Sequence, residues 1–234
     1  MDSLIDEFDF LVSEEVEKTY LEESQEYIER AKEFIKNIHS KTYQGIKSEN
    51  IISCIKIGQT ATMPWEHVSM ILDVSKLRTI DGARLEQFDI PNFVEELSSI
   101  GESEVSFNES WRNNLKYIHI PASVAVIANN TFALYNKLST VDFEDDSRLI
   151  QLGDNAFAGC KSLVTLDLRK CEYLDSLAEN TFSISNKLTT LKVTDAIDKT
   201  SLQQAVKNSA IKNVVINNVK YTREQVLNDT EYNN

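Results

Sequence analysis

The chain has 234 residues, of which 41% are apolar, and a net charge of −13 from 37 acidic and 24 basic side chains. That apolar fraction supports a hydrophobic core, while the negative charge disfavours binding to nucleic acid or to an anionic membrane. No stretch approaches the ~20 apolar residues that a membrane span requires. The charge favours a basic protein partner, or simply keeps the surface solvated.

The cysteines and the first residues bear on the cellular compartment. Cys54, Cys160 and Cys171 are few and lie in apolar stretches, so we expect buried free thiols and no disulfide framework. The N-terminus, MDSLIDEFDFLVSEE, lacks a basic start, and acidic residues interrupt its apolar run, unlike a secretory signal. We therefore expect a cytoplasmic or otherwise intracellular protein. A cell-surface location would require that a signal segment had been removed.

Residues 1–50 are predicted to form an acidic, amphipathic helical segment. Apolar residues recur at helical spacing between residues 14 and 38. Residues 1–38 hold 12 acidic and 4 basic side chains, so a net charge of −8 lies here. Two interpretations remain open. The helix caps the first turn of the following fold, or it docks on a second chain, as in a short coiled coil.

Residues 51–114 are predicted to be degenerate leading repeats. Ile52, Ile55 and Ile57 share a one, four, six spacing with two later triplets. These triplets are Leu85, Phe88 and Ile90, and Leu115, Ile118 and Ile120. The apolar pattern predicts short helices around 65–72 and 93–97 within the connections.

Residues 115–216 repeat one hydrophobic pattern at a nearly fixed step. Equivalent apolar residues stand 25 apart in three successive units, and steps of 23 extend the pattern at both ends. The columns include Val124, Leu149 and Leu174; Phe132, Phe157 and Phe182; and Leu138, Leu163 and Leu188. Such a period is typical of a solenoid, whose units bury their apolar sides against one another. We predict that the three phenylalanines form one line in the interior, and that each turn is one strand followed by an irregular arc.

Residues 217–234 are predicted to form a C-terminal cap and tail. Asn217-Asn218 fits a hairpin turn between two short strands. A helical turn is expected just before it, over 201–210, and a final short helix just after it, with Thr222 as N-cap. The last five residues are polar, and we expect no regular structure there.

The unit LKYIHIPASVAVIANNTFALYNKLSTVDF and its two successors resemble the BspA-like class of leucine-rich repeats. The shared pattern is a strand, an apolar return, an Ala-Phe or Thr-Phe pair, a small residue or cysteine, and Leu-x-x-Leu-x-Leu. Ala156-Phe157 with Cys160 matches most fully. The resemblance is clear over residues 115–193 and looser over 85–216.

The resemblance implies an α/β fold class: a right-handed leucine-rich-repeat solenoid with one parallel β-sheet, used for protein recognition. It implies no shared catalytic residue. Together with the flanking segments, it predicts a solenoid with a helical N-terminal cap and a hairpin and helix as C-terminal cap.

The third and fifth residues of each predicted strand point outward, because strand side chains alternate. The third-position row is Cys54, Gln87, Tyr117, Thr140, Thr165, Thr190 and Asn213. The fifth-position row is Lys56, Asp89, His119, Asp142, Asp167, Lys192 and Val215. The candidate partner-binding residues are Tyr117, His119, Thr140, Asp142, Thr165, Asp167, Thr190 and Lys192. Ordinary β-propensity would equally explain the threonines, and solubility the aspartates.

The sequence offers little for catalysis. No histidines, cysteines or carboxylates have metal-ligand spacing, and no glycine-rich phosphate loop occurs, so no catalytic, metal or cofactor-binding residue is expected. His119 and Asp142 fall on adjacent predicted strands and form a pair of the hydrolase type, without a matching nucleophile motif. A paired surface histidine is the simpler interpretation.

The main hypothesis is a non-enzymatic protein-protein interaction module that uses the exposed sheet face. One alternative is a structural component of a larger assembly, such as a virion, an appendage or a surface layer. Another is an acidic inhibitor of the immunity-protein type that covers a basic site on its partner. The sequence does not define the partner or the oligomeric state.

Overall fold

A computed structural model describes residues 29, 32–33, 36, 42–43, 46–47, 54–58, 69–74, 86–98 and 114–228. The strands are β1 Thr42–Tyr43, β2 Ile46–Lys47, β3 Ile55–Gly58, β4 Ser69–Asp73, β5 Gln87–Asp89, β6 Glu96–Ser98, β7 Tyr117–Ile120, β8 Val126–Ile127, β9 Thr140–Phe143, β10 Gln151–Leu152, β11 Thr165–Asp167, β12 Thr190–Val193, β13 Asn213–Ile216 and β14 Val219–Thr222. The helices with defined bounds are α4 Lys199–Lys207 and α5 Arg223–Asn228.

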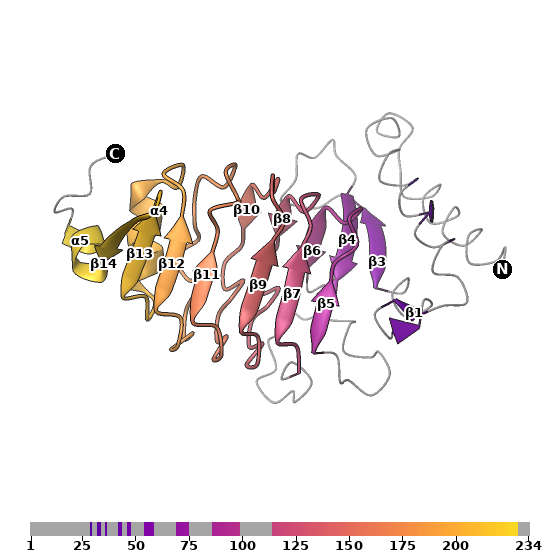
Figure 1. Cartoon of the computed structure of the whole chain (residues 1–234), viewed down its shortest axis with the longest axis horizontal. Helices are drawn as coiled ribbons and strands as arrows, with labels where there is room; N and C mark the ends of the chain where they lie inside the picture. Colours follow the sequence, from indigo (N-terminus) through magenta and orange to yellow (C-terminus); the bar gives the residue numbers. More distant parts are fainter. Residues whose placement is uncertain are drawn as a thin grey trace.

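One wall of the molecule is a row of parallel strands that begins at β5 and runs to β13. β5, β7 and β9 pair in parallel, and β11, β12 and β13 form a second parallel group. β11 lies beside β9, so the two groups form one continuous row, which we call the front wall (Figure 1). The strands alternate buried and more exposed residues, as in Tyr117–Ile120 and Thr190–Val193. This alternation turns one set of side chains into the core and the other toward solvent.

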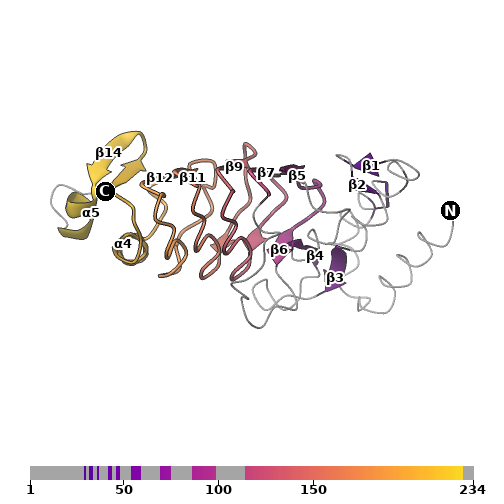
Figure 2. The same ribbon diagram turned by 90° about the horizontal axis from the view of Figure 1, so that it is seen from below.

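A second row of strands forms the opposite wall, which we call the back wall. β4, β6, β8 and β10 pair in parallel, and Figure 2 shows β3, β4 and β6 in a layer separate from the front wall. Leu97, Ile127 and Leu152 lie in register on this wall and are buried. The expectation of one sheet and an irregular arc is therefore wrong, because the apolar return segments pair with each other as well.

The first predicted strand occupies a different place from the one expected. β5 pairs with β7, Phe88 opposite Ile118, as the triplet spacing predicts. β3 instead pairs antiparallel with β4 and extends the back wall. Cys54 and Lys56 therefore do not belong to the outward rows of the front wall. The spacing of Ile52, Ile55 and Ile57 fits a strand of either wall, because it encodes burial without identifying the neighbouring strand.

Two predicted helices are strands. Residues 69–73 form β4, and residues 96–98 form β6. Short apolar runs satisfy helical and strand periodicity almost equally well, and pairing with the back wall decides between them. Residues 29, 32, 33 and 36 are helical, and the remainder of the predicted N-terminal helix lies outside the described residues.

The interior is built from the repeated apolar columns. Phe132 and Phe157 stack with ring centroids 5.3 Å apart and an interplanar angle of 16°. The Phe157 N–H donates to the Thr181 carbonyl at 2.9 Å, which places Phe182, also buried, in the next turn of the same column. The predicted line of phenylalanines is therefore present, and backbone hydrogen bonds hold successive turns in register.

Polar residues in the repeat pattern bind backbone between turns. The Cys160 thiol lies 3.3 Å from the Phe132 carbonyl, and the Ser185 hydroxyl donates to the Phe157 carbonyl at 2.6 Å. Cysteine and serine thus perform the same task one turn apart. Thr131 is buried and donates to the Ala128 carbonyl at 2.7 Å, so its hydroxyl is satisfied internally. These contacts explain why a small hydrogen-bonding residue recurs in these columns.

The last turn contains two helices and a hairpin. β13 and β14 pair antiparallel around Asn217 and Asn218, both of which have positive φ. α4 lies on the back-wall side of this turn (Figure 2). The Arg223 guanidinium donates to carbonyls at the end of α4 and just beyond it, namely those of Val206, Lys207, Ser209 and Ile211. It thereby satisfies carbonyls that a helix end leaves unpaired.

Three equivalent turn positions adopt left-handed backbone. Leu134, Gly159 and Ile184 have φ of 65°, 68° and 51°, and they stand one repeat apart. Glycine adopts this conformation freely, whereas a β-branched residue is strained in it. Ile184 is 57% exposed, so its side chain contributes little burial in return.

We predict that Ile184→Gly raises the free energy of unfolding by up to about 1 kcal/mol, because relief of left-handed strain exceeds the entropic cost of glycine. Gly159→Ala lowers it by about 1 kcal/mol or more, since an L side chain is strained at the φ of 68° that Gly159 adopts. Urea denaturation measures both changes.

The matched control is Val164→Gly, which removes a similarly exposed β-branched side chain where φ is not positive. This variant is expected to lose stability. If Ile184→Gly also loses stability, the strain argument is wrong.

Candidate functional site: the outward face of the front wall

The eight candidate residues all lie on the outward side of β7, β9, β11 and β12, which we call the sheet face. The third-position residues Tyr117 and Thr140 are directly opposite each other, as are Thr165 and Thr190. In the fifth-position row, His119 is opposite Asp142, and Asp167 is opposite Lys192. Figure 1 shows these strands side by side, so the candidates form two continuous rows.

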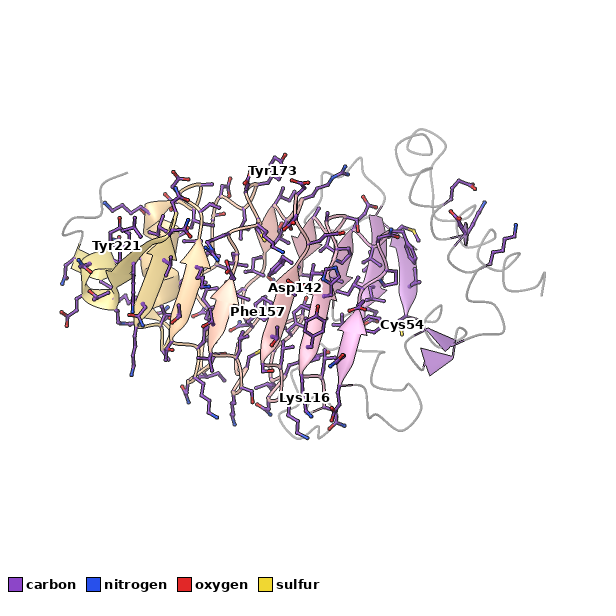
Figure 3. All side chains as sticks on the ribbon, viewed as in Figure 1. Cys54, Lys116, Asp142, Phe157, Tyr173 and Tyr221 are labelled. Carbon is purple, nitrogen blue, oxygen red and sulfur yellow. The ribbon has the colours of Figure 1, made fainter. Side chains whose placement is uncertain are left out.

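Asp142 is the centre of a polar cluster on this face. Its Oδ2 accepts a hydrogen bond from the Tyr117 hydroxyl at 3.2 Å and lies 3.0 Å from His119 Nδ1. Lys170 Nζ lies 3.9 Å from Asp142 Oδ1 and 3.0 Å from Asp145 Oδ1. Figure 3 shows Asp142 on the front wall. We call Tyr117, His119, Asp142 and Lys170 the Asp142 cluster.

A second cluster surrounds Asp167. The Arg169 guanidinium binds this carboxylate with two hydrogen bonds, of 2.9 Å from Nε and 2.7 Å from Nη2. Lys192 Nζ lies 3.3 Å from the same carboxylate. Arg169 Nη1 also donates to Asn218 Oδ1 at 2.6 Å. The cluster thus connects β11 to β12 and to the hairpin turn.

These contacts shift the ionisation of the groups involved. Burial by itself would raise the pKa of Asp167, but hydrogen bonds from the Arg169 side chain and backbone and from Lys192 outweigh it, so the pKa is lowered. Burial raises the pKa of Tyr117, and the negative charge of Asp142 raises it further. Asp167 is therefore a fixed carboxylate, and Tyr117 is a hydrogen-bond donor at neutral pH.

Sequence reasoning missed Arg169 and Lys170, which neutralise both aspartates. Both follow β11 and reach back over the sheet face. A signal was present for Lys170, which stands one repeat after Asp145 and pairs with it. Opposite charges at equivalent positions of adjacent turns indicate pairing across turns. Arg169 stands one repeat after Glu144 but pairs with Asp167 of its own turn, so the repeat does not reveal that contact.

Most of the acidity of the chain lies outside residues 114–228. Residues 114–228 contain 12 acidic and 13 basic side chains, a net charge of +1. The rest of the chain therefore has a net charge of −14, and the two parts add up to the total of −13. The sheet face belongs to a nearly neutral body in which the central carboxylates are already paired.

The described part of the chain provides little that resembles a catalytic centre. His119 and Asp142 do pair, as the sequence suggested, but Tyr117 and Lys170 compete for the same carboxylate. Burial raises the pKa of the Cys160 and Cys171 thiols to about 12, so neither is a nucleophile at neutral pH. Among the described residues, no three His, Cys, Asp or Glu side chains could hold a metal ion together.

All three cysteines are buried and free, as predicted. In the described residues, we find no helix that is long and apolar enough to cross a membrane.

A groove of about 390 Å³ lies along the back wall, next to β10. Its polar lining is engaged in contacts between turns. Asn129 Oδ1 accepts from the Asp154 N–H at 2.8 Å, and Asp154 Oδ1 accepts from the Asn180 N–H at 3.2 Å. A Cβ at Gly153 would lie 2.5 Å from Asn129 N, so glycine is required for this close approach. The groove is a consequence of how the turns stack.

Comparison with known proteins identifies the repeats. The model of the BspA type leucine rich repeat region matches residues 100–233 in six copies, more than half of the chain. A search of curated proteins finds no match.

Two solved structures are similar to the chain. A leucine rich cell surface protein from Faecalibacterium prausnitzii A2-165 is 19% identical, with 73% of this chain and 39% of that protein covered and a TM-score of 0.46. A leucine-rich repeat protein from Bacteroides ovatus ATCC 8483 is 18% identical, with 56% and 42% covered and a TM-score of 0.31. The chain thus aligns with about two fifths of each.

We predict that Asp167→Asn lowers the free energy of unfolding at about pH 6 by roughly 1 kcal/mol, a value reduced for the 36% exposure of the side chain. Because the folded-state pKa is lowered, the stabilisation is present above the unfolded pKa of about 3.9 and is lost as pH falls through the folded value.

Urea denaturation across this pH range measures the effect. Glu172→Gln removes the same charge from an exposed side chain of the same turn and serves as the control. A difference between Asp167→Asn and the native protein that persists at the lowest pH would contradict the assignment.

Proposed function

Since the chain belongs to the BspA-type leucine-rich repeat family, we propose that it is a non-enzymatic protein that binds another protein through the sheet face. The observation that carries this proposal is the two continuous rows of outward side chains on β7, β9, β11 and β12. A solenoid offers such a surface because its turns repeat the same outward positions in register.

The Asp142 cluster is the proposed anchor of the interface. Tyr117 and His119 are only partly buried, and both are held by hydrogen bonds to one carboxylate. A fixed aromatic side chain loses little conformational entropy on binding, which is why tyrosine is frequent at the centre of interfaces. The threonines beside it supply hydroxyls that are partly or fully exposed.

The pairing of the aspartates bears on the kind of partner. His119 and Lys170 pair with Asp142, and Arg169 and Lys192 pair with Asp167. A basic partner would have to compete with these internal partners of the two carboxylates. The proposed partner is therefore a polar protein surface recognised by hydrogen bonds and shape, and a basic character is not required.

The two ends of the solenoid have a separate proposed role. The acidic helical segment at the N-terminus and the hairpin with α4 and α5 at the C-terminus would cover the apolar interior of the first and last turns. An open end would otherwise expose core, as in other repeat proteins. The buried Val226 of α5, packed with the core of the last turn, supports this role at the C-terminus.

The charge distribution bears on two other functions. An inhibitor that covers a basic site would have to use the acidic parts of the chain outside residues 114–228, because residues 114–228 are nearly neutral. A role in a larger assembly is favoured by a different observation, the opposite charges of the two edges of the front wall.

The test immobilises the native chain and two variants and compares which proteins each of them retains from an extract of the source organism. The sheet-face variant combines Tyr117→Ala, Asp142→Ala and Asp167→Ala. The control variant combines Gln151→Ala and Ser176→Ala at the back wall. We expect the native chain and the control variant to retain a stoichiometric partner protein. The sheet-face variant should bind that partner with at least tenfold lower affinity, since central interface residues carry most of the binding energy.

Circular dichroism of all three proteins establishes that each is folded. A partner that binds the folded sheet-face variant as tightly as the native protein would rule out this face.

A further inference from the structure

The edge of the front wall where strands begin carries a row of lysines. The segments 130–139, 155–164, 180–189 and 205–212 lead into β9, β11, β12 and β13. They contain five basic residues, all exposed: Lys137, Lys161, Lys187, Lys207 and Lys212. The same four segments contain no aspartate or glutamate, and two acidic residues, Asp154 and Glu179, directly precede them. We call these five residues the lysine edge.

The lysines of this edge come from adjacent turns. Lys137 Nζ donates to Asn114 Oδ1 in the preceding turn at 3.2 Å, and the Lys212 N–H donates to the Thr189 carbonyl, two residues after Lys187. Figure 3 shows Lys116, which precedes β7, at this same edge. Lys116 itself is paired with Glu86 at 2.8 Å, and that glutamate precedes β5.

The opposite edge, where strands end, is acidic. Segments 144–148, 169–175 and 194–198 follow β9, β11 and β12. They hold seven exposed acidic residues: Glu144, Asp145, Asp146, Glu172, Asp175, Asp195 and Asp198. Against these stand three basic residues, Arg148, Arg169 and Lys170. We call these seven residues the acidic edge. Tyr173, from the middle segment, lies at this edge in Figure 3, opposite Lys116.

From these two edges we propose that the protein associates with a second copy of itself, with the lysine edge of one copy against the acidic edge of the next. The two edges are built by the same turns, so their charges repeat at the same spacing, about 4.8 Å per strand. Lysines of one copy therefore lie in register with carboxylates of its neighbour. The contact is heterologous, because it joins two different surfaces, and it leaves both outer edges available for further copies.

This arrangement accommodates both the net charge and the sheet face. The overall charge of −13 repels a second copy at long range. At about 0.1 M salt the screening length is about 10 Å, so distant repulsion is screened while adjacent opposite charges still attract. Contact through the edges leaves the sheet face of every copy open to a different partner.

Sedimentation velocity of the full chain tests the proposal. We expect concentration-dependent association at about 0.1 M salt that is lost at about 1 M, where the screening length falls to about 3 Å. Lys161→Gln with Lys187→Gln should raise the dissociation constant roughly fivefold, as expected for the loss of two exposed ion pairs. Lys36→Gln with Lys220→Gln removes the same charge from exposed residues outside the segments of both edges and should leave association unchanged.

Charge reversal gives the decisive comparison. Lys161→Glu with Lys187→Glu reverses one edge, and Glu172→Lys with Asp195→Lys reverses the other. Each variant alone should associate more weakly than the native chain, because both of its edges then carry charge of the same sign. An equimolar mixture of the two should form a heterodimer, in which the unaltered acidic edge of the first variant contacts the unaltered lysine edge of the second. A native chain that remains monomeric at about 0.1 M salt, or a mixture that behaves as two separate monomers, would overturn the proposal.

The sheet-face variant should associate with itself as the native chain does. Failure of this proposal and failure of the proposed function are therefore distinguishable.

Discussion

Each turn of this chain buries its apolar side chains against the turns before and after it, and this mutual burial is the constraint on which the structure depends. Phe132 and Phe157 stack directly, and the backbone of each turn donates to the next. A turn with a different path would leave both neighbours with unfilled space and unpaired backbone groups. The constant step between equivalent residues follows from this requirement.

The same constraint determines the surface. Because turns stack in register, any residue type that recurs in the sequence becomes a row on the molecule. The threonines of β9, β11 and β12 form one such row on the sheet face, and the lysines before these strands form another at the edge. The molecule therefore has three distinct surfaces from one repeat: a neutral, hydrogen-bonding face between a basic and an acidic edge.

Most of the regular region could be predicted from the sequence, because repetition supplies evidence that a single strand does not. The phenylalanine column and the outward positions of Tyr117, Asp142 and Asp167 are where the spacing predicts them. The back wall was missed because its strands are as short as Val126–Ile127, and two residues have no visible period. β3 was placed on the wrong wall, since an alternating pattern specifies burial and not the strand that pairs with it.

The candidate site was only partly predictable for a related reason. Alternation identifies which side chains point outward, but long side chains reach them from neighbouring segments. Arg169 and Lys170 do so, and they convert Asp142 and Asp167 from free charges into paired ones. The net charge of the chain also gave a wrong expectation, because it suggested an acidic binding surface. Residues 114–228, which form the sheet face, are nearly neutral, and the rest of the chain is acidic.

The most direct test of the stacked interior is amide hydrogen exchange in Phe157→Ala. Removing this ring should lower the free energy of unfolding by about 3–5 kcal/mol. It should also reduce protection together at the amides of Phe132 and Gly159, which donate to the next turns on either side of the lost ring. A loss of less than about 1 kcal/mol, or faster exchange confined to residue 157 itself, would contradict the account.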